Sequence, residues 1–400
     1  MKKSITMKKP KSIIAAAVCV SLTACAASTG FSGSEILSDD VKRSKDTAAT
    51  FNYADGCREA PLAYNSFTNT VTGFSLKLFR NAYNGKAISL APASSAVQLG
   101  LLANGAKGDS RTEILLALGG ELDLDTYNTC CSYFKSRMEN VGKIALSQES
   151  GKKDAEKTLS MDGALFINDK TDVRSAFLQT NADFYGDDII RCDFSKGADK
   201  LKDRVGDKMT LSGEDSMASY SELSLSDTWL NQSLSSEEVS MQTKTARGIV
   251  KYTANNPLRA LFIMPEGDFG TYVKSFDSVE YSKLLESIDF TKRQAAVIPS
   301  FRTEAQSADL SPVLQKIGLY TLFGENSDFG SLTHGGELTL NKFVCAAPSL
   351  SVGNSGIGSA ATADSANVEK SDDAWVFDKP FIFMLVDNET DIPVYISTVE

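Results

Sequence analysis

The chain is poor in the residues from which most catalytic and metal sites are built. Its 400 residues contain one histidine, His334, and two tryptophans. A zinc site of two or three histidines is therefore excluded, and none of the seven cysteines stands at the spacing of a zinc ligand pair. Any Ser-His-Asp triad would have to use His334, which lies in a turn-like stretch, T-H-G-G, where a bystander role is the commoner one.

Other catalytic motifs are absent or incomplete. No phosphate-binding loop of the G-x-x-x-x-G-K-[ST] type is present. Residues 353–357 (G-N-S-G-I) resemble a nucleophile elbow but end in isoleucine where glycine is needed. Ser150 and Lys153 have S-x-x-K spacing, in a polar run that does not predict a buried helix. We therefore expect an inhibitor or a binding protein rather than an enzyme, and we expect no cofactor.

Positive charge is scarce as well. The 41 Lys and Arg residues face 51 Asp and Glu residues, which gives a net charge of −10. Residues 1–24 hold five lysines and no acid, so the chain without them has 36 basic against 51 acidic side chains, a net charge of −15. This excess argues against nucleic acid as a partner and against adsorption on an anionic bilayer by charge.

The first 24 residues predict a lipoprotein signal peptide of the bacterial type. A lysine-rich flank precedes an apolar run, 13–24, that is too short to remain as a membrane-spanning helix. The run ends L-T-A before Cys25, which resembles a lipobox, so we expect a lipid on Cys25 and a flexible tether over 25–60. The expected location is outside the cytoplasm, secreted and lipid-anchored to the bacterial cell envelope. An ordinary signal peptide with an incidental cysteine is the alternative.

The apolar pattern of residues 61–400 predicts one domain of the α+β class. Helical periodicity dominates the first part and strand patterns the second, without the regular alternation of a parallel βαβ fold. Ser110 and Glu113 have the spacing of a capping box, which predicts a helix beginning there. Five cysteines lie beyond the predicted anchor, and we expect most of them to be buried and free, with room for one incidental bridge: Cys57, Cys130, Cys131, Cys192 and Cys345.

The stretch from residue 352 to residue 380 departs from this pattern. Its first half consists mostly of Gly, Ser, Ala and Thr, which fit where a backbone must enter a crowded space. Its second half is polar and acidic. Before Lys379 it contains one basic residue, Lys370, which is followed by Ser371. Composition alone leaves two interpretations open: a disordered surface loop, or a mobile loop that is cut and then inserts as a strand.

Six segments between residues 66 and 400 resemble, in order, the motifs of the serpin family. They are LAPAS (90–94), LLANGAKGDSRTEI (101–114), ALF (164–166) with FY (184–185) and DFS (193–195), IPSF (298–301) with IGL (317–319) and LF (322–323), DF (328–329), and DKPFIF (378–383). Each motif is weak alone, and their common order makes the resemblance specific.

The resemblance implies an α+β fold of three β-sheets, about eight or nine helices and an exposed reactive-centre loop at about 353–379. Serpins inhibit serine or cysteine proteases as suicide substrates. The protease attacks the loop and forms an acyl-enzyme, and the loop then inserts into the central sheet, which distorts the protease. The resemblance therefore implies a monomeric inhibitor whose partner is a serine or cysteine protease.

The hinge of the loop and its cleaved bond can be placed from the same resemblance. The hinge residues are Gly356, Ile357, Gly358, Ser359, Ala360, Ala361 and Thr362. Counting forward from Gly356 puts the cleaved bond between Lys370 and Ser371, while counting back from Pro380 gives Glu369 or Lys370. A lysine at this position would fit a trypsin-like protease, whose pocket holds a carboxylate.

Several positions depart from the family pattern. Ile357 stands where inhibitory members usually have Thr or Ser, although a β-branched apolar side chain suits a buried strand. Ser94 matches the serine near the start of the family's second helix. Trp229 matches the tryptophan of the breach, the region at the top of the family's central sheet. The asparagine expected eight residues before Trp229 is Ser221, and the histidine expected ten residues before the hinge glycine is Ala346. Those two groups hydrogen-bond in the shutter of many members, so their replacement bears on how the sheet opens.

The region 200–265 is also short, by about one strand, before the apolar run 261–265. The resemblance thus favours an inhibitor and leaves an alternative: a non-inhibitory serpin-fold protein that binds a partner or is merely a protease substrate. An unrelated enzyme, such as a peptidoglycan hydrolase, is a third alternative.

Overall fold

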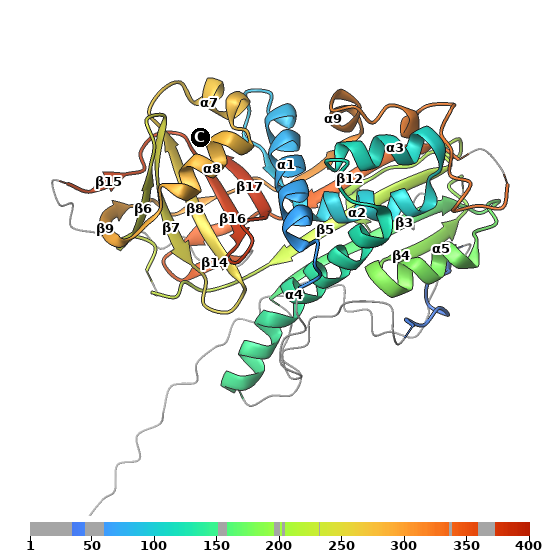
Figure 1. Ribbon diagram of the computed structural model, residues 1–400, viewed down its shortest axis with the longest axis horizontal. Coiled ribbons are helices and arrows are strands. Elements are labelled where there is room, and N and C mark those ends of the chain that lie inside the picture. Colours follow the sequence, from blue (N-terminus) through green and yellow to red (C-terminus); the bar gives the residue numbers. More distant parts are fainter. Residues whose placement is uncertain are drawn as a thin grey trace, which may run out of the picture.

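The structure is a computed structural model that describes residues 34–44, 60–150, 158–195, 201, 205–231, 233–335, 338–358 and 373–400. In the helix Leu124–Ser150 the side chains are described as far as residue 141. Within these residues the chain forms eight α-helices and three β-sheets, so the predicted α+β class and the three-sheet architecture are confirmed. Figure 1 shows two halves side by side, one built around an eight-stranded sheet and the other around a six-stranded sheet.

The eight-stranded sheet forms most of the apolar core of one half. Its strands, in spatial order, are β15 (Trp375–Val376), β9 (Asp289–Val297), β6 (Glu237–Gln242), β7 (Ala246–Tyr252), β8 (Leu258–Pro265), β16 (Phe381–Asp387), β17 (Pro393–Val399) and β2 (Ser89–Leu90). Every residue of β8 and β16 is buried, as their continuous apolar sequences predict. Between Trp229 and β8 the described chain forms only two strands, β6 and β7, in the region that is short in sequence.

The six-stranded sheet contains a parallel pair of strands in its second half. Its spatial order is β1 (Ser34–Ile36), β4 (Asp188–Cys192), β3 (Leu159–Asn168), β5 (Met217–Leu225), β12 (Leu340–Ala347) and β11 (Gln306–Asp309). β12 is paired directly and in parallel with β5. We call this boundary the seam. No described strand lies between its two sides, and an inserted strand would have to enter here.

A small three-stranded sheet lies beyond the C-terminal ends of β5 and β12, which we call the upper end of the seam. It consists of β10 (Phe301–Arg302), β13 (Ser351–Gly353) and β14 (Gly356–Gly358), with β13 in the middle. β13 follows β12 after a break that contains Pro348, a residue that cannot donate a ladder hydrogen bond. This sheet places the first residues of the predicted reactive loop beside the top of the six-stranded sheet.

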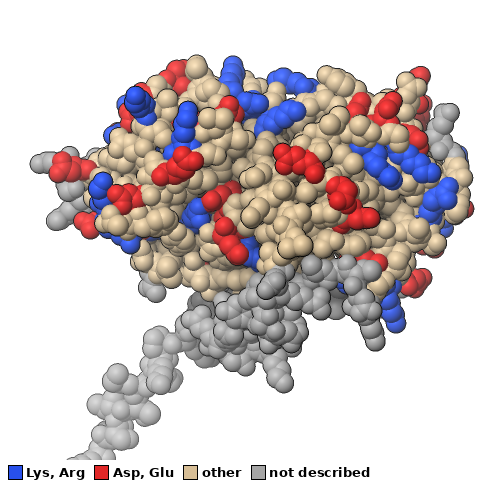
Figure 2. Space-filling view, in the orientation of Figure 1, with Lys and Arg blue, Asp and Glu red and all other residues tan. Residues whose placement is uncertain are grey.

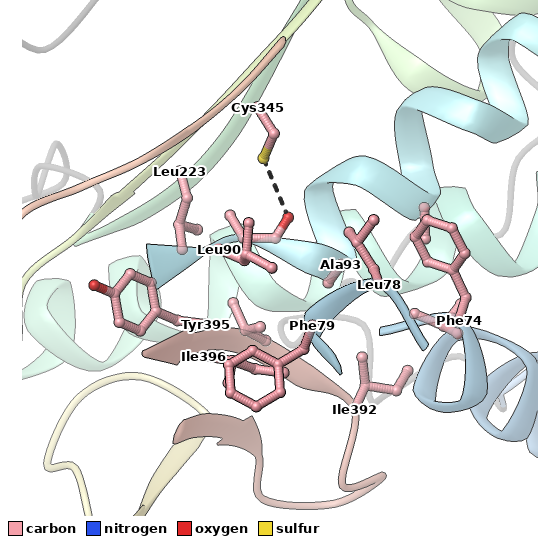
Figure 3. Close-up of a cluster of buried hydrophobic side chains, with 14 of the residues drawn as sticks. Phe74, Leu78, Phe79, Leu90, Ala93, Leu223, Cys345, Ile392, Tyr395 and Ile396 are labelled. Carbon is pink, nitrogen blue, oxygen red and sulfur yellow. Dashed lines mark hydrogen bonds between the residues drawn. The ribbon is translucent and has the colours of Figure 1, made fainter. Parts of the chain in front are cut away.

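The helices cover the two large sheets. They are α1 (Tyr64–Ala82), α2 (Pro92–Gly105), α3 (Gly108–Ala117), α4 (Leu124–Ser150), α5 (Ser175–Thr180), α7 (Phe269–Ser275), α8 (Ser278–Glu286) and α9 (Ser311–Lys316). α2 is buried on nearly every side because it contacts both β5 and β17, and so joins the two halves. Figure 3 shows this junction, where side chains of α1 and β17 meet the start of α2, with Leu223 of β5 and Cys345 of β12 on its other side.

The capping box predicted at Ser110 is wrong. α3 begins two residues earlier, at Gly108, whose positive φ of 51° is available to glycine. The Ser110 hydroxyl accepts a hydrogen bond from the backbone N–H of Asp328, and the Glu113 carboxylate accepts one from the N–H of Thr321. Both side chains therefore tie the helix to a distant segment and do not cap its own first turn.

Part of the predicted tether packs on the domain. Residues Ser34–Ile36 form β1, which pairs antiparallel with β4. The following residues reach α5 and its continuation, where Ser44 donates from its backbone N–H and its hydroxyl to the carboxylate of Asp183. Among the described residues, no helix is both long and apolar enough to cross a bilayer. The predicted signal peptide and Cys25 lie outside the described residues.

Candidate functional site: the hinge and the seam

The first residues of the predicted loop form a strand at the upper end of the seam. Gly356–Gly358 pairs antiparallel with Ser351–Gly353, and residues 354 and 355 make the turn between them. On the opposite side, the backbone N–H of Ile357 donates to the carbonyl of Asp227, and the N–H of Asp227 donates to the carbonyl of Ile357, both at 2.8 Å. Ile357 is therefore held from both sides, as a strand inserted between β12 and β5 would be.

Glycine is required at the start of this strand because the chains approach so closely. A Cβ on Gly356 would lie 2.1 Å from the carbonyl oxygen of Asp227 and 2.7 Å from the Cα of Thr228, and φ at Gly356 is +139°. A Cβ on Gly358 would lie 3.1 Å from the Cβ of Ser226, a tight contact. The two glycines that flank Ile357 thus allow the hinge to enter between the strands.

The side chain of Ile357 points into the protein and is only 2% exposed. It belongs to the main apolar core. The sequence predicts that this position faces the interior once the loop inserts, and the structure buries it while the seam below is still closed. A charged side chain here would have to be desolvated, which costs several kcal/mol without a partner.

The side chain of Asp227 anchors the strand that receives the hinge. Asp227 is 8% exposed, and its carboxylate accepts hydrogen bonds from five N–H groups, at distances from 2.7 to 3.3 Å. One is the backbone N–H of Thr228, and the others are the backbone and side-chain N–H groups of Asn255 and Asn256, in the turn after β7. Hydrogen bonds to a charged acceptor are the strong ones, so this cluster fixes the end of β5 to the other half of the molecule.

Trp229 completes the wall of the hinge. Its indole N–H donates to the carbonyl of Gly353 at 2.7 Å, and its side chain is 1% exposed. The ammonium of Lys251 lies 5.5 Å from the ring centroid and forms a buried ion pair with Glu238 at 2.5 Å. Burial lowers the pKa of Lys251, while the hydrogen bond and charge of Glu238 act to raise it. We call the set Asp227, Trp229, Gly353 and Gly356–Gly358 the hinge seat.

The middle of the seam has a different character. Ser221 of β5 lies opposite Cys345 of β12, and Ser94 lies at the start of α2 beneath them. All three are at most 3% exposed, yet the hydroxyls of Ser94 and Ser221 have no hydrogen-bond partner among the described residues. The thiol of Cys345 donates to the carbonyl of Ala91 at 3.4 Å, and burial raises the pKa of this thiol. We call Ser94, Ser221 and Cys345 the mid-seam cluster.

The residue of β12 that lies opposite Ser221 is Cys345. It is one position before Ala346, at which counting from the hinge glycine places the histidine of the shutter. Ala346 lies opposite Glu222 and packs with Ala164 and Tyr220 on the other face of the sheet. The residue that faces Ser221 and α2 is Cys345. Because side chains alternate between the two faces of a strand, a shift of one residue exchanges the face.

The structure brings some of the predicted site residues together and separates others. Gly356, Ile357 and Gly358 meet Trp229 in the hinge seat, while Ser94 and Ser221 lie lower, in the mid-seam cluster. The remaining predicted positions lie outside the described residues: Ser359, Ala360, Ala361, Thr362, Lys370, Ser371 and Cys25. His334 lies in a turn, where its backbone N–H donates to the carbonyl of Asp172.

Sequence reasoning missed Asp227 and Cys345. Asp227 follows β5 and the pair Asn255–Asn256 follows β7, and each is typical of a polar turn. The local sequence does not predict that these two turns contact each other. Cys130, Cys131, Cys192 and Cys345 are buried and free, as expected for most cysteines, whereas Cys57 lies outside the described residues. No cluster of metal-ligating side chains occurs in the part of the chain that the structure describes.

Comparison with known proteins accounts for this arrangement. The family model described as "Serpin (serine protease inhibitor)" matches residues 69–209 and 236–400. The stretch between the two ranges, which the match does not cover, holds Asp227 and Trp229. Mouse "Serpin A9" is 24% identical to the chain over 376 residues, which cover 82% of this chain and 87% of that protein.

Solved structures agree at the level of the fold. The native state of the thermophilic serpin tengpin superposes with a TM-score of 0.70 at 19% identity, over 92% of this chain and 99% of that one. Human thyroxine-binding globulin, in complex with its hormone, superposes with a TM-score of 0.67 at 18% identity, over 84% and 98% of the two chains. Since the family model covers well over half of the sequence, the chain belongs to the serpin family, whose members are generally protease inhibitors and not enzymes.

Proposed function

We propose that this serpin is a cell-surface suicide-substrate inhibitor of serine proteases with trypsin-like specificity, with cysteine proteases as a second target class. The observation that carries the proposal is the position of β14. The hinge already occupies the place of an inserted strand, antiparallel to both β13 and Asp227, while β5 and β12 remain paired below it. Further insertion needs only the separation of these two strands.

The chemistry of the proposed reaction belongs to the protease. Its nucleophile attacks the carbonyl of Lys370, the peptide bond to Ser371 breaks, and the new amino group of Ser371 leaves with the proton. Lys370 is then held as an ester, or as a thioester with a cysteine protease. The loop residues after Gly358 then enter the seam as a strand and carry the attached protease with them before water can hydrolyse the acyl bond.

The hinge seat supports this reaction by starting the strand in the correct register. The antiparallel pairing of Ile357 sets which loop residues will face the core and which will face outward, because side chains alternate along the strand. The small residues 359–363 follow at once. Their lack of bulk and charge supports their entry into a closed sheet.

The proposed location follows from the N-terminal sequence. A lipid on Cys25 would hold the protein on the outer side of a bacterial membrane, since a strongly acidic chain is not held there by charge. The segment that packs as β1 lies soon after Cys25, so the lipid would hold the domain close to the surface.

A second candidate is a serpin-fold protein that binds a partner or is cleaved without trapping the protease. The mid-seam cluster favours it, because the polar pair that many members use in the shutter is replaced by Ser221 and Cys345. Thyroxine-binding globulin, one of the structural relatives, is described as a hormone complex, so the fold also hosts ligand binding.

The two candidates are separated by the product formed with a trypsin-like protease. The full chain is incubated with the protease at equal concentrations and analysed under denaturing conditions. An inhibitor gives a covalent complex that survives denaturation and contains both chains. Complete cleavage near Lys370 without any complex would contradict inhibition and support the substrate alternative.

A further inference from the structure

A basic pocket lies at the end of the six-stranded sheet where β3 ends and β12 begins, opposite to the end that carries the hinge seat. It is a cavity of about 260 Å³ between the end of α2, the start of α3, α5 and the segment 330–331. Its lining includes Lys107, Arg174 and Ser331, with Phe177 forming an apolar wall. In Figure 2 basic side chains lie over the region of α3, with acidic side chains beside them.

The polar groups of the pocket are mainly hydrogen-bond donors. The Nε of Arg174 donates to the carbonyl of Thr333 at 2.8 Å, and its two terminal nitrogens have no partner among the described residues. The ammonium of Lys107 likewise forms no ion pair within the described ranges. The hydroxyl of Ser331 accepts from Arg111 at 3.1 Å, which leaves its own hydrogen free to be donated.

The absence of a side chain at Gly330 leaves room for the side chain of Lys107. A Cβ on Gly330 would lie 3.4 Å from Cδ and 3.7 Å from Nζ of Lys107, so the bare backbone lets the lysine lie along the loop. The nearest carboxylate, that of Asp328, accepts the backbone N–H of Gly330 through Oδ1 and forms no ion pair with Lys107. Two cations thus line one cavity and form no ion pair among the described residues, although the Asp328 carboxylate lies beside Gly330.

Two like charges that share one cavity repel each other, and a bound anion would relieve that repulsion. From this geometry we propose that the pocket binds a small oxyanion, a carboxylate or a phosphate, which accepts from Lys107, Arg174 and Ser331 together. Arg provides a planar fork and Lys a point charge, the usual pair for such groups.

The pocket also spans the two sides of the seam. Arg174 follows β3, which pairs with β5, whereas Ser331 and Thr333 precede β12. Direct bonds already join the two sides: the N–H of Arg174 donates to the carbonyl of Leu332 at 2.8 Å, and the Thr333 hydroxyl donates to that of Asp172 at 3.1 Å. A strand inserted at the seam would move β5 and β12 about 4.8 Å further apart, to about 9.6 Å. A bound oxyanion would add contacts across this boundary and restrain the opening, a consequence that rests on the proposed function.

Binding is tested first, by titration calorimetry of the full chain with inorganic phosphate and, separately, with malonate. We expect one saturable site for at least one of them. Lys107→Met should weaken the binding about tenfold or more and Ser331→Ala a few-fold, because each removes one donor to an anion. Lys244→Met, which removes an exposed lysine between β6 and β7, should leave it unchanged.

Tighter binding of phosphate identifies a phosphate ligand, and tighter binding of malonate a carboxylate ligand. The proposal is overturned if neither ion gives a saturable site. It is equally overturned if binding is the same in Lys107→Met as in the original chain.

The link to the seam is tested by thermal unfolding of the intact chain and of the chain nicked at the loop, each with and without the saturating anion. The anion should raise the melting temperature of the intact form and not that of the nicked, inserted form. An equal rise in both would refute the link across the seam. If the chain forms no covalent complex with proteases, the proposed function fails, while the calorimetric result still decides whether the pocket binds anions.

Discussion

The hinge seat and the mid-seam cluster lie on the same boundary between β5 and β12 and are built in opposite ways. In the hinge seat the polar groups are satisfied: the carboxylate of Asp227 accepts from five N–H groups, and the indole of Trp229 donates to Gly353. In the mid-seam cluster the hydroxyls of Ser94 and Ser221 are buried without partners among the described residues. An unsatisfied buried hydroxyl costs about 1–3 kcal/mol, so the seam is strong at the hinge seat and weaker in the middle, which the loop would cross in the proposed insertion.

This contrast explains how a closed sheet can hold a hinge without completing the insertion. The upper strand pairs are fixed to the turn that contains Asn255 and Asn256, so the entrance keeps its shape. Below, Ser221 and Cys345 lie opposite each other, and the Ser221 hydroxyl has no hydrogen-bond partner of normal geometry among the described residues. The predictions that follow test the two ends of the seam in order of expected effect.

Cleavage of the loop should produce the largest change, because it releases the loop to fill the seam. An added strand of about ten ladder hydrogen bonds at ~1 kcal/mol each, at ~2 °C per kcal/mol, predicts a rise in melting temperature of about 20 °C. The nicked and intact full chains are compared by calorimetry. An unchanged melting temperature would show that the seam does not accept the loop and would remove the functional meaning of the contrast.

Ile357→Arg should abolish trapping of the protease while leaving cleavage intact. An arginine at this buried position would have to be desolvated without a partner, which costs several kcal/mol, so the hinge would leave its seat. We expect the covalent fraction of the product to fall at least about tenfold, measured by denaturing electrophoresis.

Ile357→Val is the matched control for this substitution, since it keeps a β-branched apolar side chain and should trap normally. Normal trapping by the arginine variant would mean that residue 357 does not enter the sheet, in conflict with the register of the hinge.

Asp227→Ala should destabilise the native chain by about 3 kcal/mol, because five N–H groups lose a charged acceptor. The free energy of unfolding is measured by urea titration. Asp215→Ala, in a turn before β5 where the carboxylate accepts from the N–H of Ser212, is the control and should cost less. Equal losses would show that the Asp227 cluster is not a special anchor of the hinge seat.

Ser221→Ala should have the smallest effect and the opposite sign. Removal of an unsatisfied buried hydroxyl should raise the free energy of unfolding by about 1 kcal/mol and slow the trapping of protease, since the seam becomes apolar. Ser224→Ala, at an exposed position of the same strand, should leave both quantities unchanged. Destabilisation by Ser221→Ala would mean that the hydroxyl is satisfied and would erase the contrast.

Much of the fold could be predicted because its signals are local. Helical periodicity in the first part of the chain and strand patterns in the second predicted the α+β class, and the apolar run 261–265 lies in the buried strand β8. The capping box at Ser110 failed because its two side chains found partners on a distant segment, at Asp328 and Thr321. A spacing rule cannot see such competition.

The sequence by itself determined the class of fold, because apolar periodicity depends on residue type at fixed spacing along one segment, and the order of its motifs indicated the family that the comparison shows. Only the tertiary structure decided that Cys345, and not Ala346, lies opposite Ser221, because the pairing of β5 with β12 sets the register and a shift of one residue exchanges the faces of a strand. The clusters around Asp227 and in the basic pocket also needed the fold, since their members come from segments far apart in the chain. Long-range packing brings them together, and no local pattern specifies it.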